Sequence, residues 1–162
     1  MTSRSGYKLL LVLYPNGYGI ATGSYMSLFI VLLRSNFDPI LKFPLDGTVQ
    51  FTLYDQTSTG QSVFKSFLTR DQPTFFGKPT SEANAPYGIS NFVQLDRLTT
   101  ENSRFIVEDS IFIKTSVDFS HLSNVLSKTV VHNSPAQLRS DDSCLHKDHE
   151  DMFLIGIENF SI

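Results

Sequence analysis

The stretch that decides the fold is KLLLVLYPNGYGIATGSYMSLFIVLL, residues 8–33. Two apolar runs flank a loop that contains Pro-Asn-Gly and two further glycines, a pattern typical of two antiparallel strands joined by a turn. Successive side chains of a strand point to opposite faces, yet both runs are apolar on both faces. One face can pack in a core, so the other must be covered by another part of the chain or be kept open for a partner.

The two faces of these runs are separated by taking alternate residues. One set is wholly apolar or aromatic in both runs, and we expect it to face the core. The other set contains Lys8 and Ser27 and is expected to point outward, although it also carries Val12, Tyr14 and Phe29. Scattered apolar groups are common on protein surfaces. The pattern alone therefore leaves open whether this outward face is an ordinary surface or a docking site.

The rest of the first 120 residues repeats the β pattern. Alternating stretches between turn residues predict further strands at 48–55, 61–68, 88–94 and 110–118. A helical period extends over no more than one turn, near residues 95–98. Short strands at this spacing, without a long amphipathic helix, predict an all-β protein with an antiparallel sandwich or barrel.

Charge and composition exclude several classes of function. Residues 1–121 carry ten basic and ten acidic side chains, and the whole net charge of −3 belongs to residues 122–162. Nucleic-acid binding needs a concentrated basic footprint, so no nucleic-acid partner is expected. Apolar runs fall short of the roughly 20 residues that cross a bilayer, so membrane insertion is not expected. The single cysteine, Cys144, fits a reducing compartment and a cytoplasmic location.

Residues that could carry chemistry do not form a recognisable catalytic pattern. The glycine-rich loop at 17–23 precedes a β-like run and lacks the Lys-Ser/Thr pair of a phosphate loop. Cys144, His146 and His149 offer three metal ligands, whereas a structural zinc site uses four. We therefore expect a chain without catalytic activity, a cofactor or a bound metal.

Motifs along residues 2–120 resemble the C-terminal, MATH-type domain of the tumour-necrosis-factor-receptor-associated factors, the TRAF family. The family's motifs occur here in the same order and at near-identical spacing. The segments that carry the resemblance are TSRSGYK (2–8), YPNGYG (14–19), SYMSLFIVLLRSNFD (24–38), ILKFPLDGTVQFTLYDQ (40–56), SFLTRDQPTFFGKP (66–79) and FIVEDSIFIKTSVD (105–118).

The resemblance implies an antiparallel β-sandwich over residues 1–121. Family members have eight strands, the first of which lies upstream and contains a tryptophan. This chain has no tryptophan, and Met1 stands just before the second strand, so about seven to eight strands are expected, with the first missing. Residues 122–162 form a polar, acidic tail that we expect to be largely disordered. Its apolar stretch, 152–160, could dock on the body in place of the missing strand, but we favour an unstructured segment.

The resemblance also implies a function. The domain would be a cytoplasmic signalling adaptor that binds extended peptides by β-strand addition to an apolar sheet face. Its partners would be adaptor peptides or the cytoplasmic tails of TNF-receptor or Toll/interleukin-type receptors. Self-association is expected to be at most a weak trimer, because the sequence has no coiled coil. Two alternatives stay open, namely a substrate-recognition module of a ubiquitin ligase and a truncated, non-functional remnant.

The resemblance assigns candidate contact residues in this sequence by matching them, one position at a time, to the family's contact positions. Val12 and Leu68 stand where the family usually has arginines, Tyr18 replaces a loop aspartate, and Thr74 and Phe75 replace serines that hold a polar side chain. Because these charged and hydroxyl groups are mostly lost, we expect a more apolar or aromatic ligand. The implied peptide contacts are Val12, Tyr14, Tyr18, Gly19, Phe29, Phe67, Leu68, Thr74, Phe75, Tyr87 and Gly88.

Overall fold

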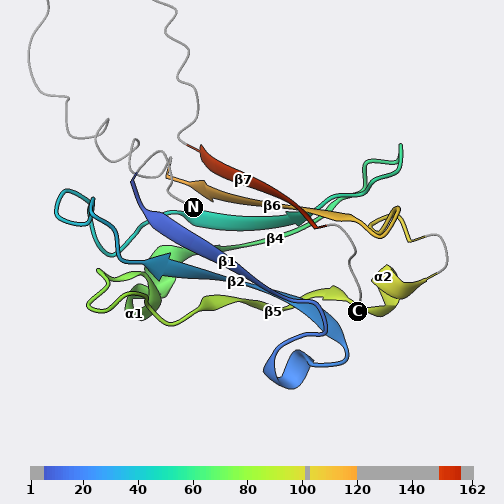
Figure 1. Cartoon of the computed structure of the whole chain (residues 1–162), viewed down its shortest axis with the longest axis horizontal. Coiled ribbons are helices and arrows are strands. Elements are labelled where there is room, and N and C mark those ends of the chain that lie inside the picture. The colour runs from blue at the N-terminus through green and yellow to red at the C-terminus, as the bar shows by residue number, and fades with distance from the viewer. Residues whose placement is uncertain (1–5, 101–102, 120–149, 158–162) are drawn as a thin grey trace, which may run out of the picture.

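The computed structural model describes residues 6–100, 103–119 and 150–157. Alternating sequence patterns form strands, and only single turns of helix separate them (Figure 1). The strands are β1 (Lys8–Tyr14), β2 (Tyr25–Leu33), β3 (Thr48–Leu53), β4 (Val63–Leu68), β5 (Tyr87–Gln94), β6 (Ile111–Asp118) and β7 (Glu150–Ile157). The helical turns are η1 (Gly19–Ala21), η2 (Thr69–Asp71), α1 (Pro73–Phe76) and α2 (Asp96–Thr99).

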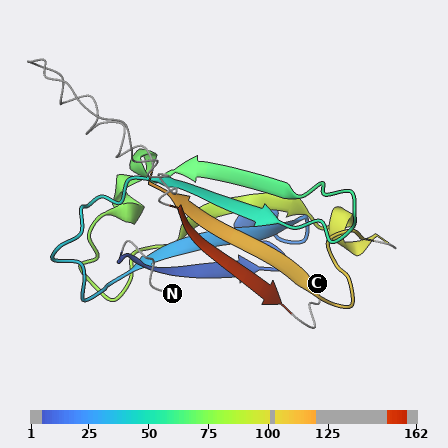
Figure 2. The ribbon, with the colours of Figure 1, turned by 90° about the horizontal axis from the view of Figure 1, so that it is seen from above.

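Two antiparallel sheets form the layers of a sandwich, as Figures 1 and 2 show. The first sheet has the strand order β1-β2-β5, and the second has the order β4-β3-β6-β7. Helices α1 and α2 lie at opposite ends of the sandwich (Figure 1). The predicted antiparallel β-sandwich is therefore confirmed, and each strand predicted within residues 1–121 is present, with bounds moved by at most two residues.

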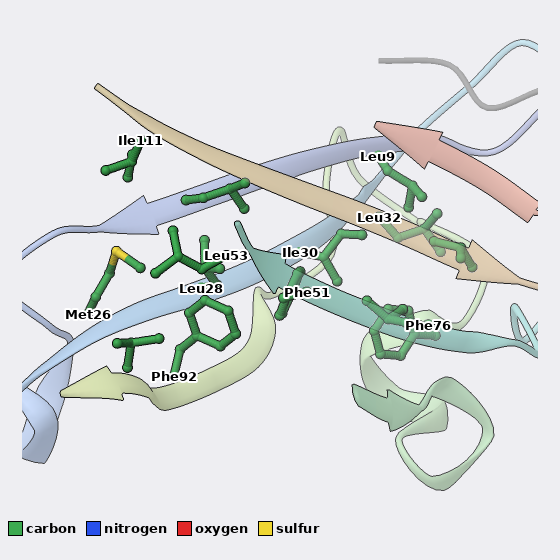
Figure 3. Close-up of a cluster of buried hydrophobic side chains, with 14 of the residues drawn as sticks. Leu9, Met26, Leu28, Ile30, Leu32, Phe51, Leu53, Phe76, Phe92 and Ile111 are labelled. Atoms are coloured by element: carbon green, nitrogen blue, oxygen red, sulfur yellow. The ribbon is translucent and has the colours of Figure 1, made fainter. Parts of the chain in front are cut away.

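The core lies between the two sheets and is built from the alternate residues that the sequence assigned to it. On β2, Met26 and Leu28 are fully buried, as is Phe51 on β3 (Figure 3). The rings of Phe51 and Phe92 lie 6.2 Å apart, centroid to centroid, and join the two layers. Burying a side chain of this size stabilises the fold by about 1.5–3 kcal/mol. The predicted inward face of the opening hairpin is thus confirmed.

Strand β7 corrects the expectation for the end of the chain. Residues 150–157 pair antiparallel with β6 over its whole length, from Asp118–Glu150 to Ile111–Ile157. The expectation of an unstructured segment is wrong for this stretch. The physical reason is that β3 pairs with only one edge of β6, and the apolar segment can satisfy the backbone groups along the second edge. The boundary after residue 121 stays a prediction, and the Cys144–His149 cluster lies outside the described residues.

The connection between β3 and β4 is organised by one buried carboxylate. Asp55 accepts hydrogen bonds from the hydroxyls of Thr57 and Thr59, each at 2.6 Å, and from the backbone amides of Thr57 and Gln61. The nearest guanidinium nitrogen of Arg104 lies 3.6 Å away. The Thr57 hydroxyl, then the Thr59 hydroxyl and the backbone donors, hold the pKa of Asp55 far below its usual range.

This carboxylate predicts a pH dependence of stability. A lowered pKa in the folded state means that the stabilisation is complete above the unfolded pKa of about 4 and is lost progressively as the pH falls below it. Urea unfolding followed by circular dichroism should therefore give a midpoint that falls on acidification. Asp55→Asn should lower the midpoint at pH 7 and flatten its decline towards pH 3. An unchanged pH profile in the variant would contradict this role.

Candidate peptide-binding face

The outward face of the β1-β2-β5 sheet is apolar and almost without charge. Of the side chains in its three strands, only that of Lys8 is charged at neutral pH. Across the first two strands, Val12 pairs with Phe29, and Tyr14 pairs with Ser27. Leu10, on the same face, is 46% exposed. The prediction that this set of residues points away from the core is confirmed.

Three rings gather on this face and form what we call the outer aromatic cluster, defined as Tyr14, Tyr18 and Phe29. The centroid distances are 4.9 Å for Tyr14–Tyr18, 5.3 Å for Tyr18–Phe29 and 5.7 Å for Tyr14–Phe29. Tyr14 and Phe29 are half-buried, and Tyr18 is 51% exposed. Mutual packing restricts the rings while their free faces stay accessible, which suits them to anchor a partner at a low entropic cost.

Ser27 fixes the loop that carries Tyr18. It points outward by register, yet it is fully buried, because the loop folds over it. Its hydroxyl donates to the carbonyl of Ser90 on β5 and accepts a 3.0 Å hydrogen bond from the Tyr18 amide. This position lies where the pairing of β2 with β5 shifts register. Ser27 thus ties the aromatic cluster to the sheet.

Replacing this serine should weaken both the fold and the cluster. Ser27→Ala leaves the Tyr18 amide and the Ser90 carbonyl without their partner in a buried place, which costs about 1–3 kcal/mol. We expect a lower denaturation midpoint and broadened NMR resonances of the Tyr18 ring. Ser66→Ala, at an exposed position of β4, is the control and should change neither. A Ser27→Ala variant as stable as the wild type would show that the two hydrogen bonds of the Ser27 hydroxyl contribute little to the stability of the fold.

The second group of predicted residues lies where the edge strands of the two sheets meet. Strands β4 and β5 each end their sheet and lie close together, since the rings of Phe67 and Tyr87 are 5.0 Å apart. A pocket of about 350 Å³ opens beside them. We call it the edge pocket. It contains Phe67, Leu68 and Tyr87 from the predicted set. Its lining residues are Thr48, Ser66, Phe67, Leu68, Asp71, Gln72 and Tyr87.

Phe67 lies differently from the expectation that it shares one surface with Tyr14 and Phe29. It pairs with Val49, which is buried in the core, and its ring lies 6.1 Å from Phe51 and 5.0 Å from Tyr87. Phe67 therefore points toward the sandwich interior and reaches solvent only at the edge pocket. The reason is the period of two along β4, which places Phe67 on the same face as Lys65 and Val63. The predicted site is thus divided into a face and a pocket.

Gly88 stands between these two parts. It pairs with Phe29 on β2, and its neighbour Tyr87 borders the pocket. A Cβ atom added to Gly88 would lie 2.2 Å from the carbonyl oxygen of Leu28 and 2.5 Å from the Cα of Phe29. Only glycine allows β5 to approach β2 this closely, so the residue has a structural role whatever its role in binding.

The remaining predicted residues lie at the margins. Gly19 begins η1 with φ +62°, and the space beside it is open. Phe75 on α1 packs its ring 5.0 Å from that of Tyr87, whereas Thr74 is exposed and does not line the edge pocket. Sequence reasoning missed Asp71 and Gln72. Their place directly after β4, in the turn that follows Leu68, was the signal that could have found them.

A comparison with models of protein families shows to which family this chain belongs. The family model described as "TRAF/meprin, MATH domain" matches residues 1–114. This chain belongs to that family. The resemblance inferred from the motifs is confirmed, and the MATH domain is thereby an adaptor-type protein-interaction domain. The match includes β1 to β5 and the first part of β6, and therefore both halves of the candidate site, whereas β7 lies beyond it.

Known proteins agree with this assignment. The MATH domain is 32% identical over 124 residues to mouse TNF receptor-associated factor 5, covering 76% of this chain and 22% of that protein. It is 34% identical to mouse TNF receptor-associated factor 1 (74% and 29% covered) and 33% identical to human TNF receptor-associated factor 2 (75% and 24% covered). The chain thus spans about a fifth to three tenths of the length of these relatives.

A solved structure shares the fold. TRAF5 of Notothenia coriiceps superposes with a TM-score of 0.66 at 34% identity, covering 71% of this chain and 57% of that one. In the part of the chain that the structure describes, no helix has the length and hydropathy to cross a membrane. Within the same residues, no group of three or more His, Cys, Asp or Glu side chains is placed to hold a metal ion.

Proposed function

We propose that this MATH domain binds extended peptides from receptors or adaptor proteins in the cytoplasm, as part of a signalling adaptor. The observation that carries the proposal is the outer aromatic cluster, three mutually packed rings on a sheet face that is nearly free of charge. The relatives are TNF receptor-associated factors, which favours receptor or adaptor peptides over degradation substrates of a ubiquitin ligase.

The free edge of β5 is where a peptide strand would add. β5 pairs with β2 along one side and ends the described sheet on the other. Further along β5, the Asn91 carbonyl already accepts a hydrogen bond from the Lys65 ammonium, so the stretch around Tyr87 to Ile89 is the accessible part. Backbone hydrogen bonds there would supply affinity, and side-chain contacts with the cluster and the pocket would supply specificity.

The chemistry of the face defines the ligand. A surface made of tyrosine, phenylalanine, valine and leucine side chains gains free energy by burying apolar groups and gains little from carboxylates. The positions expected to hold charged contacts are Val12 and Leu68, both half-buried and apolar. The ligand would therefore be an apolar or aromatic peptide segment.

A peptide array probed with the full chain tests this proposal. Eight-residue peptides with apolar and aromatic centres should retain the protein, and peptides with acidic-polar centres should not. Tyr14→Ala should weaken retention, with circular dichroism confirming that the variant is folded. Retention by acidic-polar peptides alone, unaffected by Tyr14→Ala, would refute the proposal.

A further inference from the structure

The edge pocket has a charge character that the aromatic face lacks. Asp71, exposed at the end of η2, is the one charged side chain among the lining residues. Within the described residues its carboxylate has no ion-pair or hydrogen-bond partner. Two other lining residues are aromatic, Phe67 and Tyr87, whose rings lie 5.0 Å apart at an angle of 73°. The pocket thus combines an unpaired anion with two half-buried aromatic rings.

Within the described residues, neither neighbouring cation forms an ion pair with this carboxylate. Arg70 precedes Asp71 in η2 but does not line the pocket. Lys65, on the adjacent strand β4, donates its ammonium group to the Asn91 carbonyl. A carboxylate entering the pocket would meet Asp71 and be repelled, whereas a guanidinium or ammonium group would be attracted. The same cation would be favoured by the aromatic rings, because ring faces carry partial negative charge.

We propose that the edge pocket takes a basic side chain, arginine or lysine, of the peptide bound by this domain. Asp71 is its counter-ion, and the Tyr87 ring is the surface on which the cation or its alkyl stem lies. The inference rests on the proposed function, because a peptide must follow β5 to place a side chain between β4 and β5. It adds a requirement that the aromatic face does not impose, namely one cationic residue beside the apolar ones.

A substitution array tests the pocket. Each position of an apolar eight-residue peptide that binds the full chain is replaced in turn by Arg, Lys, Gln and Glu. We expect one position at which Arg or Lys strengthens binding about fivefold over Gln, as one well-placed ion pair would, and at which Glu weakens it. Asp71→Asn should remove this preference, and Asp71→Lys should reverse it in favour of Glu.

The matched control is Asp96→Asn. Asp96 is likewise an exposed aspartate, but it begins α2, at the end of the sandwich opposite α1 (Figure 1). This variant should keep the preference for Arg or Lys. If apolar peptides bind but no position distinguishes Arg from Glu, or if Asp71→Lys keeps the preference, the pocket inference is overturned while the proposed function stands. If no apolar peptide binds, the proposed function fails and this inference fails with it.

Discussion

Gly88→Ala should destabilise this domain severely, although it adds only one methyl group. The new Cβ would meet the Leu28 carbonyl oxygen at 2.2 Å and the Phe29 Cα at 2.5 Å. Both contacts are with backbone, so no side chain can turn away to relieve them. Strand β5 would have to move off β2, which breaks part of their ladder. We expect a loss of about 3 kcal/mol or more, a large share of the roughly 5–15 kcal/mol that stabilises a typical domain.

Gly60→Ala is the control for this effect. A Cβ at Gly60 has nothing within 4 Å, but its φ of +64° disfavours alanine, which costs about 1 kcal/mol. Urea denaturation followed by circular dichroism compares the two, since the chain has no tryptophan for fluorescence. Equal midpoints for Gly88→Ala and the wild type would show that β5 accommodates the methyl group without separating from β2.

Phe29→Ala should have the largest effect on peptide binding. The ring packs edge-on against both Tyr14 and Tyr18 in the outer aromatic cluster. Truncating a central aromatic anchor commonly costs about 2 kcal/mol or more of binding free energy. This corresponds to an affinity about 30-fold lower, measurable by fluorescence polarisation with a labelled apolar peptide selected on the array.

Phe64→Ala is the matched variant. Phe64 is a 65% exposed phenylalanine on β4, in the other sheet, where it pairs with Thr52. The Phe64→Ala variant should bind the peptide as the wild type does, since Phe64 lies in the opposite layer of the sandwich. Equal losses in both variants would place the binding surface elsewhere than on the outer aromatic cluster.

The sequence predicts those parts of the fold that are defined by local alternation of apolar and polar side chains. Strands β1 to β6 are visible in the sequence because β-type residues run between turn residues, and in all but β4 one face buries apolar side chains. Strand β7 could not be assigned from its own pattern, because whether an apolar segment pairs or stays free depends on a distant edge, here that of β6. Helix α1 is a single turn beginning at Pro73 and is too short to show a period.

For a similar reason, some residues of the candidate site could be placed from the sequence and others could not. Tyr14 and Phe29 follow from alternation along two paired strands, and the resemblance adds Tyr18. Phe67 was expected beside Tyr14 and Phe29, but it belongs to the other sheet, where alternation along β4 turns its ring toward Val49 and the interior. Ser27 looked like a surface residue, and only the loop folded over it explains its burial. Asp71 follows Leu68 closely in the sequence, which could have drawn attention to it, but its place in the edge pocket depends on the meeting of two sheet edges.

The pairing of β7 with β6 has a consequence for synthesis on the ribosome. Strands β3, β4 and β6 emerge before β7, so the backbone donors and acceptors along the edge of β6 that faces away from β3 have no partner strand until residues 150–157 have been added. During that interval the exposed edge is open to strands of other chains. Molecular chaperones that shield such edges should therefore associate with this polypeptide after β6 has been synthesised and leave once β7 has docked.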